Sequence, residues 1–124
     1  MSDAPVLRRF RDVVAAGGYI GAGDPDAVAA FGEHGAMAAQ SATTGPLGGS
    51  VDGAIAFKEA LLPRWFWRCG HGSQEPGWAH LNRVHPDHCD RLDEANGKAS
   101  TPAKALVLAV LNAALAMAEA GQCA

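Results

Sequence analysis

The sequence predicts an α+β fold: a small antiparallel sheet of two or three strands packed by helices, with a helical N-terminal half. Three observations predict it. Apolar residues recur at helical spacing before residue 40, an aromatic segment whose side chains alternate between two faces follows Pro63, and an Ala/Leu/Val-rich segment opens with a capping residue near Thr101. The chain has 124 residues, a length that supports one core rather than two. We therefore expect a single domain over residues 1–124.

Residues 1–40 are expected to form two helices. Asp3 is the candidate cap of the first, Pro5 lies near its first turn, and Gly17-Gly18 ends it. The predicted buried face of this helix consists of Val6, Phe10, Val13 and Val14.

The second helix opens after Asp24-Pro25 and runs through Gln40. Its apolar stripe is weak and consists of Val28, Phe31 and Met37. Gly32 and Gly35 lie inside this stripe, and each costs about 1 kcal/mol relative to alanine. We therefore expect this helix to be short or broken.

Residues 41–50 are rich in Gly, Ser and Thr and form the clearest linker in the chain. They separate the helical part, residues 1–40, from a helix–strand–strand–helix unit over residues 51–124. The first helix of this unit is capped by Ser50 or Asp52 and ends before Pro63, because proline disfavours a helical residue ahead of it. Its predicted buried residues are Ile55, Leu61 and Leu62.

Two strands follow, and side-chain alternation assigns their faces. One face of the first strand carries Trp65, Trp67, Cys69 and His71, and the other carries Phe66 and Arg68. After a loop over residues 70–77, one face of the second strand carries Trp78, His80, Asn82 and Val84, opposite Ala79, Leu81 and Arg83. Asn96-Gly97 is predicted to mark a turn.

The final helix has Ser100 or Thr101 as its cap, Pro102 at its first position and Gly121 at its end. Its apolar body contains Leu106, Val107, Val110, Leu111 and Leu115. The apolar stretch is interrupted by Lys104 and Asn112 and is shorter than the roughly 20 residues that span a bilayer. We therefore expect a buried helix and no membrane contact.

Three segments carry a resemblance to a known family: the helix end Leu61-Leu62-Pro63, the aromatic strand Trp65-x-Trp67, and the helix start Thr101-Pro102-Ala103-Lys104-Ala105-Leu106. Residues from about 51 to 120 resemble small phage and prophage proteins described as an ABA-sandwich domain. The resemblance implies a phage origin and a helix–sheet–helix layering, and it supplies no catalytic motif. The central section, His71 to Gly97, is longer and more polar than the family pattern.

Charge and composition restrict the partners and the location. The net charge is −3 with ten basic residues, which disfavours tight binding to duplex nucleic acid and to strongly acidic surfaces. The start of the chain lacks a basic segment followed by an apolar stretch, so a bacterial cytoplasmic location is expected. Three cysteines at irregular spacing are typical of reduced thiols rather than of a disulfide framework.

Four of the five histidines and two of the three cysteines lie between residues 69 and 89. The cluster consists of Cys69, His71, His80, His85, His88 and Cys89. Cys69, His71, His85, His88 and Cys89 form the pool from which a tetrahedral zinc site would draw its ligands. The spacing is not that of a standard zinc finger, and the simpler interpretation is a solvated turn at residues 85–88 with Cys69 as a small buried residue. No cofactor is therefore expected, with zinc as the alternative.

An enzymatic interpretation would use one of these histidines as a base, oriented by Glu75, Asp87 or Asp90, or Cys69 or Cys89 as a nucleophile. No local signature joins any such pair, so we expect no enzyme.

Trp65, Trp67 and Trp78 are predicted core residues. A tryptophan exposed beside Arg68 or Arg83 would instead stack on a base or anchor a protein interface.

The expected function is that of a non-enzymatic phage or prophage accessory protein that binds and inhibits a host defence component, as an anti-CRISPR-type inhibitor or a sink for a defence signal. The partner is a host protein or protein complex. The alternatives are a zinc-binding module and a small virion-associated protein. The candidate contact residues are Arg8, Arg9, Arg11, Arg68, His71, Trp78 and Arg83.

Overall fold

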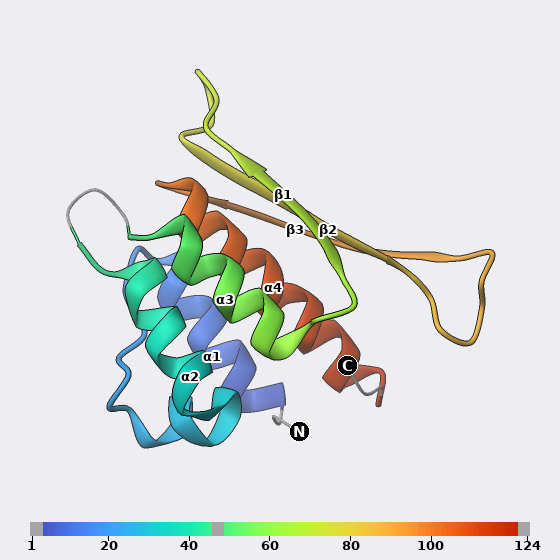
Figure 1. The fold of residues 1–124 in the computed structure, drawn as a ribbon, viewed down its shortest axis with the longest axis horizontal. Coiled ribbons are helices and arrows are strands. Elements are labelled where there is room, and N and C mark those ends of the chain that lie inside the picture. Colours follow the sequence, from blue (N-terminus) through green and yellow to red (C-terminus); the bar gives the residue numbers. More distant parts are fainter. Residues whose placement is uncertain (1–3, 46–48, 122–124) are drawn as a thin grey trace.

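The computed structural model describes residues 4–45 and 49–121 and confirms the α+β class. In chain order, the described elements are α1 (Ala4–Ala15), α2 (Pro25–Thr43), α3 (Val51–Leu61), β1 (Phe66–Gly70), β2 (Gly77–Val84), β3 (Leu92–Ala99) and α4 (Pro102–Glu119). The strands form one antiparallel sheet in the order β1-β2-β3. The described helices lie together on one side of this sheet, with α4 next to the strands (Figure 1).

The layering differs from the helix–sheet–helix arrangement that the resemblance implied. Helices cover one face of the sheet, and no described element covers the other (Figure 1). The reason lies in the side chains: α1, α2 and α3 bury their apolar residues against one another and α4. On the uncovered face, the middle strand β2 carries the polar residues His80 and Asn82 between Trp78 and Val84, so the centre of this face is polar.

The first two helices follow the predicted pattern with local differences. Helix α1 buries Leu7, Phe10 and Val14, whereas the predicted core residue Val13 is exposed. Its predicted cap, Asp3, lies outside the described residues. Helix α2 is broken at Gly32, whose φ of 76° is left-handed, so the predicted break is confirmed.

Helix α2 continues three residues beyond the predicted end, to Thr43, so residues 41–43 are not linker as predicted. The buried hydroxyl of Thr43 explains the extension. It donates to the carbonyl of Ala39 at 2.7 Å and accepts the backbone N–H of Ile20 at 3.0 Å, which fixes the helix end to the segment after α1.

Helix α3 begins where Ser50 accepts the N–H of Gly53 at 3.1 Å. Ile55 and Leu61 were predicted to be buried but are only partly so, because α3 turns Ala54 and Phe57 into the core instead. Phe57 completes an aromatic column with the two residues that α1 and α2 contribute. The ring centroids of Phe10 and Phe31 are 5.3 Å apart, and those of Phe31 and Phe57 are 5.0 Å apart.

The second hairpin corrects the prediction of a turn at Asn96-Gly97. Both residues lie inside β3, where Gly97 pairs with Ala79 of β2. A side chain at position 97 would collide with the backbone of α4 at Ala105 and Ala109. Glycine is required here because the strand lies directly against the helix, not because the chain turns.

Helix α4 is the centre of the fold. Thr101 caps it by accepting the N–H of Lys104 at 3.2 Å, and the helix packs against the other three described helices and all three strands. By length and composition alone, α4 would pass as a membrane-spanning helix. Most of its residues are buried inside the protein, as in the core helix of a folded domain.

Candidate functional site

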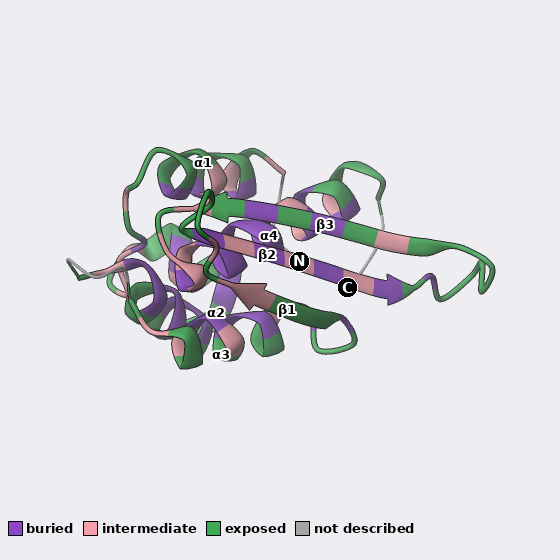
Figure 2. Ribbon diagram, turned by 90° about the horizontal axis from the view of Figure 1, so that it is seen from above, coloured by how far each residue is buried: buried purple, intermediate pink, exposed green. Residues whose placement is uncertain are grey.

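The uncovered face of the sheet, called the open face below, is the main candidate site (Figure 2). Residues paired across an antiparallel sheet point to the same side, and Ala79, Leu81 and Ala95 point toward α4 and are buried. The alternate residues therefore form the open face: Phe66, Arg68, Trp78, His80, Asn82, Val84, Leu92, Glu94, Asn96 and Lys98. This confirms the predicted assignment of faces in both strands.

The open face carries three exposed large apolar side chains. Phe66 is 70% exposed, Leu92 62% and Val84 54%. Trp78 is partly buried because its indole lies over Gly70, the residue opposite it on β1. Along β1, therefore, Phe66, Arg68 and the Trp78 indole follow one another on one face at steps of two residues, roughly 7 Å each.

Most charges near this face are paired. Nε2 of His80 lies 3.3 Å from Oε1 of Glu94, and Nζ of Lys98 lies 2.8 Å from Oε1 of Glu75. The hydrogen bond from Lys98 to Glu75 and the charge of that carboxylate raise the pKa of Lys98. Arg68 differs, because it forms no ion pair with any residue that the structure describes.

On the side of the sheet that faces the helices, Asp93 joins two arginines. Oδ2 of Asp93 lies 3.0 Å from Nε of Arg83, and its Oδ1 lies 2.9 Å from a terminal nitrogen of Arg91. Burial acts to raise the pKa of Asp93, but the hydrogen bonds from Arg83 and Arg91 outweigh it and lower that pKa. The carboxylate therefore stays ionised between the two guanidinium groups at neutral pH.

Arg83 was predicted to be a contact residue, but it lies in the interior. It is 5% exposed, and its guanidinium carbon lies 4.9 Å from the centre of a Trp65 ring. The cause is β3, whose position in the chain the sequence did not predict: this strand brings Asp93 opposite Arg83. Arg83 stabilises the fold and is not accessible to a partner.

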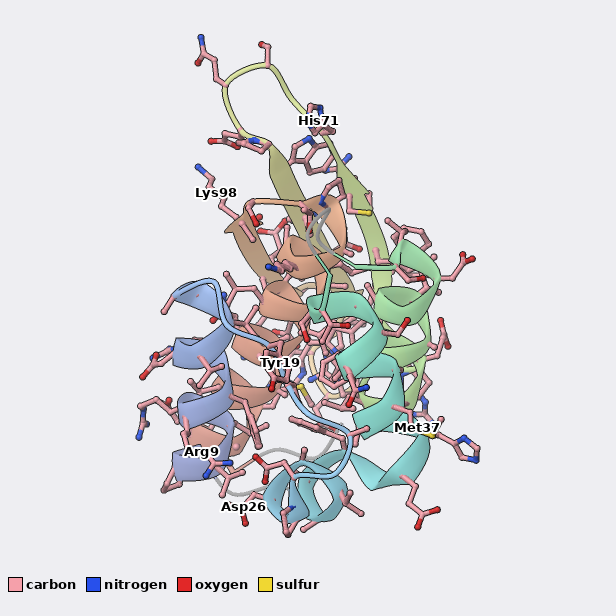
Figure 3. All side chains as sticks on the ribbon, turned by 90° about the vertical axis from the view of Figure 1, so that its left-hand side faces the viewer. Arg9, Tyr19, Asp26, Met37, His71 and Lys98 are labelled. Carbon is pink, nitrogen blue, oxygen red and sulfur yellow. The ribbon has the colours of Figure 1, made fainter. Side chains whose placement is uncertain are left out.

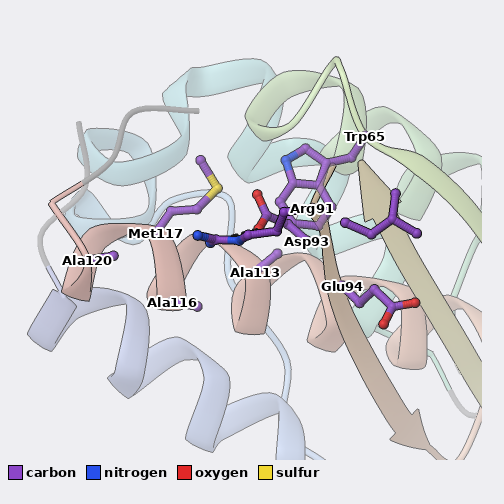
Figure 4. A pocket seen from close by; sticks show the side chains of 9 residues that line it. Trp65, Arg91, Asp93, Glu94, Ala113, Ala116, Met117 and Ala120 are labelled. Carbon is purple, nitrogen blue, oxygen red and sulfur yellow. Dashed lines mark hydrogen bonds and ion pairs between the residues drawn. The ribbon is translucent and has the colours of Figure 1, made fainter. Parts of the chain in front are cut away.

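A pocket of about 330 Å³ lies between the start of β3 and the C-terminal half of α4 (Figure 4). Trp65 and Met117 line its apolar part, and Arg91 and Asp93 line its polar part. The indole nitrogen of Trp65 is buried and has no hydrogen-bond partner within residues 4–45 and 49–121. The arginine and aspartate of the pocket already neutralise each other, so the pocket offers an incoming ligand fewer free groups than the open face.

The basic run on α1 does not form a cationic patch. Arg8 pairs with Glu119 at 3.2 Å, Arg9 with Asp24 and Asp26 at 3.3 and 3.0 Å, and Arg11 with Asp12 at 3.0 Å. Figure 3 shows Arg9 beside Asp26, on the helical side of the molecule and remote from His71 and Lys98. Each predicted contact on α1 therefore faces a carboxylate of this same chain.

The predicted zinc pool is divided between the two ends of the sheet. Cys69 and His71 lie at the β1–β2 loop, whereas His85, His88 and Cys89 lie in the β2–β3 loop at the opposite end (Figure 1). The described residues contain no group of three His, Cys, Asp or Glu side chains close enough to hold a metal ion. His85 is buried, and its Nδ1 accepts the N–H groups of Asp87 and His88, both at 3.1 Å, so this nitrogen shapes the loop.

The candidate general acid–base and nucleophilic groups are also dispersed. Glu75 is engaged by Lys98, and Asp87 and Asp90 are exposed in the β2–β3 loop. Burial raises the pKa of the Cys69 thiol, which disfavours its nucleophilic thiolate form. Cys89 is exposed in a loop at the other end of the sheet.

Among the predicted contacts, the structure brings only Arg68 and Trp78 together on the open face, with His71 exposed in the adjoining loop. Phe66, Val84 and Leu92 were missed as surface residues of the site. The alternation in β1 and β2 carried the signal for the first two, because both fall on the face opposite the buried residues. Trp65 is in the core as predicted, while Trp67 is 39% exposed because β1 is at the edge of the sheet.

No family model, curated protein or solved structure matches this chain.

Proposed function

We propose that this chain is a non-enzymatic binding module that contacts a partner protein through the open face. In keeping with its resemblance to phage proteins, we propose that it is a phage or prophage protein, and that its partner is a host defence component that it inhibits by stoichiometric binding. The observation that carries the proposal is the open face itself: a sheet surface with exposed Phe66, Val84 and Leu92 beside Arg68, which has no ion-pair partner among the described residues.

The chemistry of this face supports a protein partner. Aromatic residues and arginine are enriched at the centres of protein interfaces, and contiguous exposed apolar surface marks interaction sites. Phe66, Arg68 and Trp78 provide these residue types within one row. The surrounding Glu94 and Lys98 provide a charged rim of both signs, which suits a protein surface better than a polyanion.

The test is a phage challenge in a bacterial host that carries one defined defence system at a time. Expression of the wild-type chain is expected to restore phage plating against one such system. With the purified target, inhibition is expected to saturate near one molecule per target and to leave the mass of the target unchanged. Sub-stoichiometric inactivation or a covalent change of the target would contradict the proposal.

A matched pair of variants locates the surface. Phe66→Ser removes the most exposed apolar side chain of the open face, and Tyr19→Ser removes one of similar exposure, 63%, on the helical side. Both changes leave the core intact. Phe66→Ser is expected to abolish the protection of the phage and Tyr19→Ser to preserve it; equal effects of the two variants would contradict the use of the open face.

A further inference from the structure

The outer edge of β1 is unlike the outer edge of β3. β1 reads Phe66-Trp67-Arg68-Cys69-Gly70, with one charged residue and no proline, whereas β3 carries Asp93, Glu94 and Lys98. Sheet edges in monomeric proteins are usually protected by charged residues, prolines or bulges, because an apolar edge recruits another strand. By this criterion β3 is a protected edge and β1 is not.

The backbone of β1 is available for pairing. Its strand hydrogen bonds go to β2 on one side, and no other backbone or side-chain hydrogen bond of its residues to the described chain is present. Because successive residues of an antiparallel strand point their N–H and C=O groups alternately to the two sides, about half of these groups in β1 point outward. The outer edge of β1 is therefore a row of unused donors and acceptors.

The side chains of β1 specify what would pair with it. On the open face, Arg68 has no ion-pair partner among the described residues and stands next to the exposed Phe66. On the side toward the helices, Trp67 is 39% exposed. Directly opposite side chains on neighbouring strands interact, and opposite charges in such positions are favourable.

We propose that β1 accepts an extended segment of a partner protein as a fourth strand. A carboxylate side chain of this segment lies opposite Arg68 on the open face, and an adjacent apolar side chain covers Trp67 on the other side. The proposal deepens the proposed function and rests on it. A second copy of this chain fits less well, because its β1 would bring another arginine, not a carboxylate, to the same face.

The test uses the full chain and a synthetic peptide of alternating threonine and valine with one central glutamate. Binding is measured by calorimetry, and the exchange of backbone amides is followed by NMR. The peptide is expected to bind and to slow amide exchange in β1 but not in β3. Arg68→Glu is expected to weaken binding about tenfold and to confer binding of the same peptide with lysine in place of glutamate.

Lys104→Glu is the matched control, because it makes the same charge change outside the open face, in the first turn of α4, where a glutamate suits the helix N-terminus. It is expected to leave peptide binding unchanged. An N-methylated peptide that cannot pair with a strand edge is expected not to bind. Lack of binding by the glutamate peptide, or equal effects of Arg68→Glu and Lys104→Glu, would overturn strand addition at β1.

Other occupants give distinct results. A concentration-dependent dimer that excludes the peptide would mean that a second copy of this chain, not a partner strand, occupies the β1 edge. Binding of a single-stranded oligothymidylate that Arg68→Glu abolishes would mean that nucleic acid occupies it. If Arg68→Glu leaves inhibition of the defence component intact while Phe66→Ser abolishes it, strand addition is wrong and the proposed function stands. If both Arg68→Glu and Phe66→Ser still inhibit the defence component, strand addition and the proposed use of the open face are both contradicted.

Discussion

The indole of Trp78 lies over the backbone of Gly70, the residue opposite it across the β1–β2 hairpin. A methyl group at position 70 would come within 2.6 Å of Cζ2 of that indole. Because Gly70 has no side chain, this position on β1 leaves room for the Trp78 indole of β2. The Trp78 indole therefore lies at the Gly70 end of the row formed by Phe66, Arg68 and Trp78.

Gly70→Ala should displace the Trp78 indole. Because the ring sits at the surface and can rotate outward, we expect a modest cost of about 1–2 kcal/mol in the free energy of unfolding. Tryptophan fluorescence should shift toward that of a more solvated indole, and the binding proposed for the open face should weaken. Gly21→Ala, where the nearest atom outside the adjoining residues is 3.9 Å away, should change neither fluorescence nor stability.

Gly97→Ala should be more damaging, because the new methyl group would meet the backbone of α4 and not a movable side chain. We expect a loss of about 2–4 kcal/mol in urea unfolding, because strand and helix must separate to admit it. Gly23→Ala is the comparison, since no atom lies within 4 Å of the added carbon. A Gly97→Ala protein as stable as Gly23→Ala would mean that β3 and α4 are not in close contact.

Acid should weaken the fold partly through Asp93. Since the folded protein lowers the pKa of Asp93, the carboxylate contributes stability above its unfolded pKa of about 3.9, and this contribution is lost as the pH falls through the lower folded pKa. Asp93→Asn should cost about 2–4 kcal/mol at neutral pH, because Arg83 stays buried without its carboxylate, and the cost should shrink toward pH 2.

Unfolding by urea at several pH values measures this effect. Glu33→Gln, which alters an exposed carboxylate on α2, should leave the curve of stability against pH nearly unchanged. If Asp93→Asn and the wild-type protein lose stability in parallel as the pH falls, the Arg83–Asp93–Arg91 group is not the acid-sensitive element.

Leu111→Asp should unfold the protein. Leu111 is fully buried on α4, and an aspartate there would bury an unpaired charge, at a cost of about 4 kcal/mol or more. Ala116→Asp makes the same type of change at an exposed position of α4 and should be tolerated. Thermal melting followed by circular dichroism compares them, and a Leu111→Asp protein that melts with the wild type would refute the central place of α4.

The two described cysteines should differ in reactivity. Burial raises the pKa of Cys69, whereas Cys89 is exposed in the β2–β3 loop. In a Cys123→Ser protein, iodoacetamide at mildly alkaline pH should modify Cys89 at least about tenfold faster than Cys69, because the thiolate is the reactive form. Peptide mapping by mass spectrometry gives both rates, and faster modification of Cys69 would contradict its position at the sheet.

The parts of the fold that depend on local signals could be predicted from the sequence. A capping residue such as Thr101 and a helix-ending residue such as Pro63 act within one turn of the helix end that they define. Side-chain alternation in β2 assigned its two faces correctly. β3 was missed because Leu92–Ala99 is mostly polar and contains Asn96-Gly97, residues typical of turns. Its strand conformation depends on pairing with β2 and on the packing of α4 against Gly97, contacts between elements that the local sequence pattern does not show.

The candidate site was harder to predict because its residues come from different strands. Arg68 and Trp78, predicted as contacts, lie together on the open face, but nothing local shows that Arg83 is neutralised by Asp93 ten residues later. The zinc hypothesis rested on closeness in sequence. The β1–β2 hairpin separates its proposed ligands in space: Cys69 pairs with Ala79 near the start of β2, whereas His85 follows the end of β2, although the two residues are only sixteen apart in numbering.

The central place of α4 also has a consequence for synthesis of the protein on the ribosome. Helices α1 to α3 and the sheet all pack on α4, yet α4 is the last described element to be translated. The nascent chain therefore exposes the apolar faces of the earlier elements until residues 102–119 have emerged. Chaperones that hold apolar segments are expected to bind this nascent chain before α4 emerges and to release it afterwards.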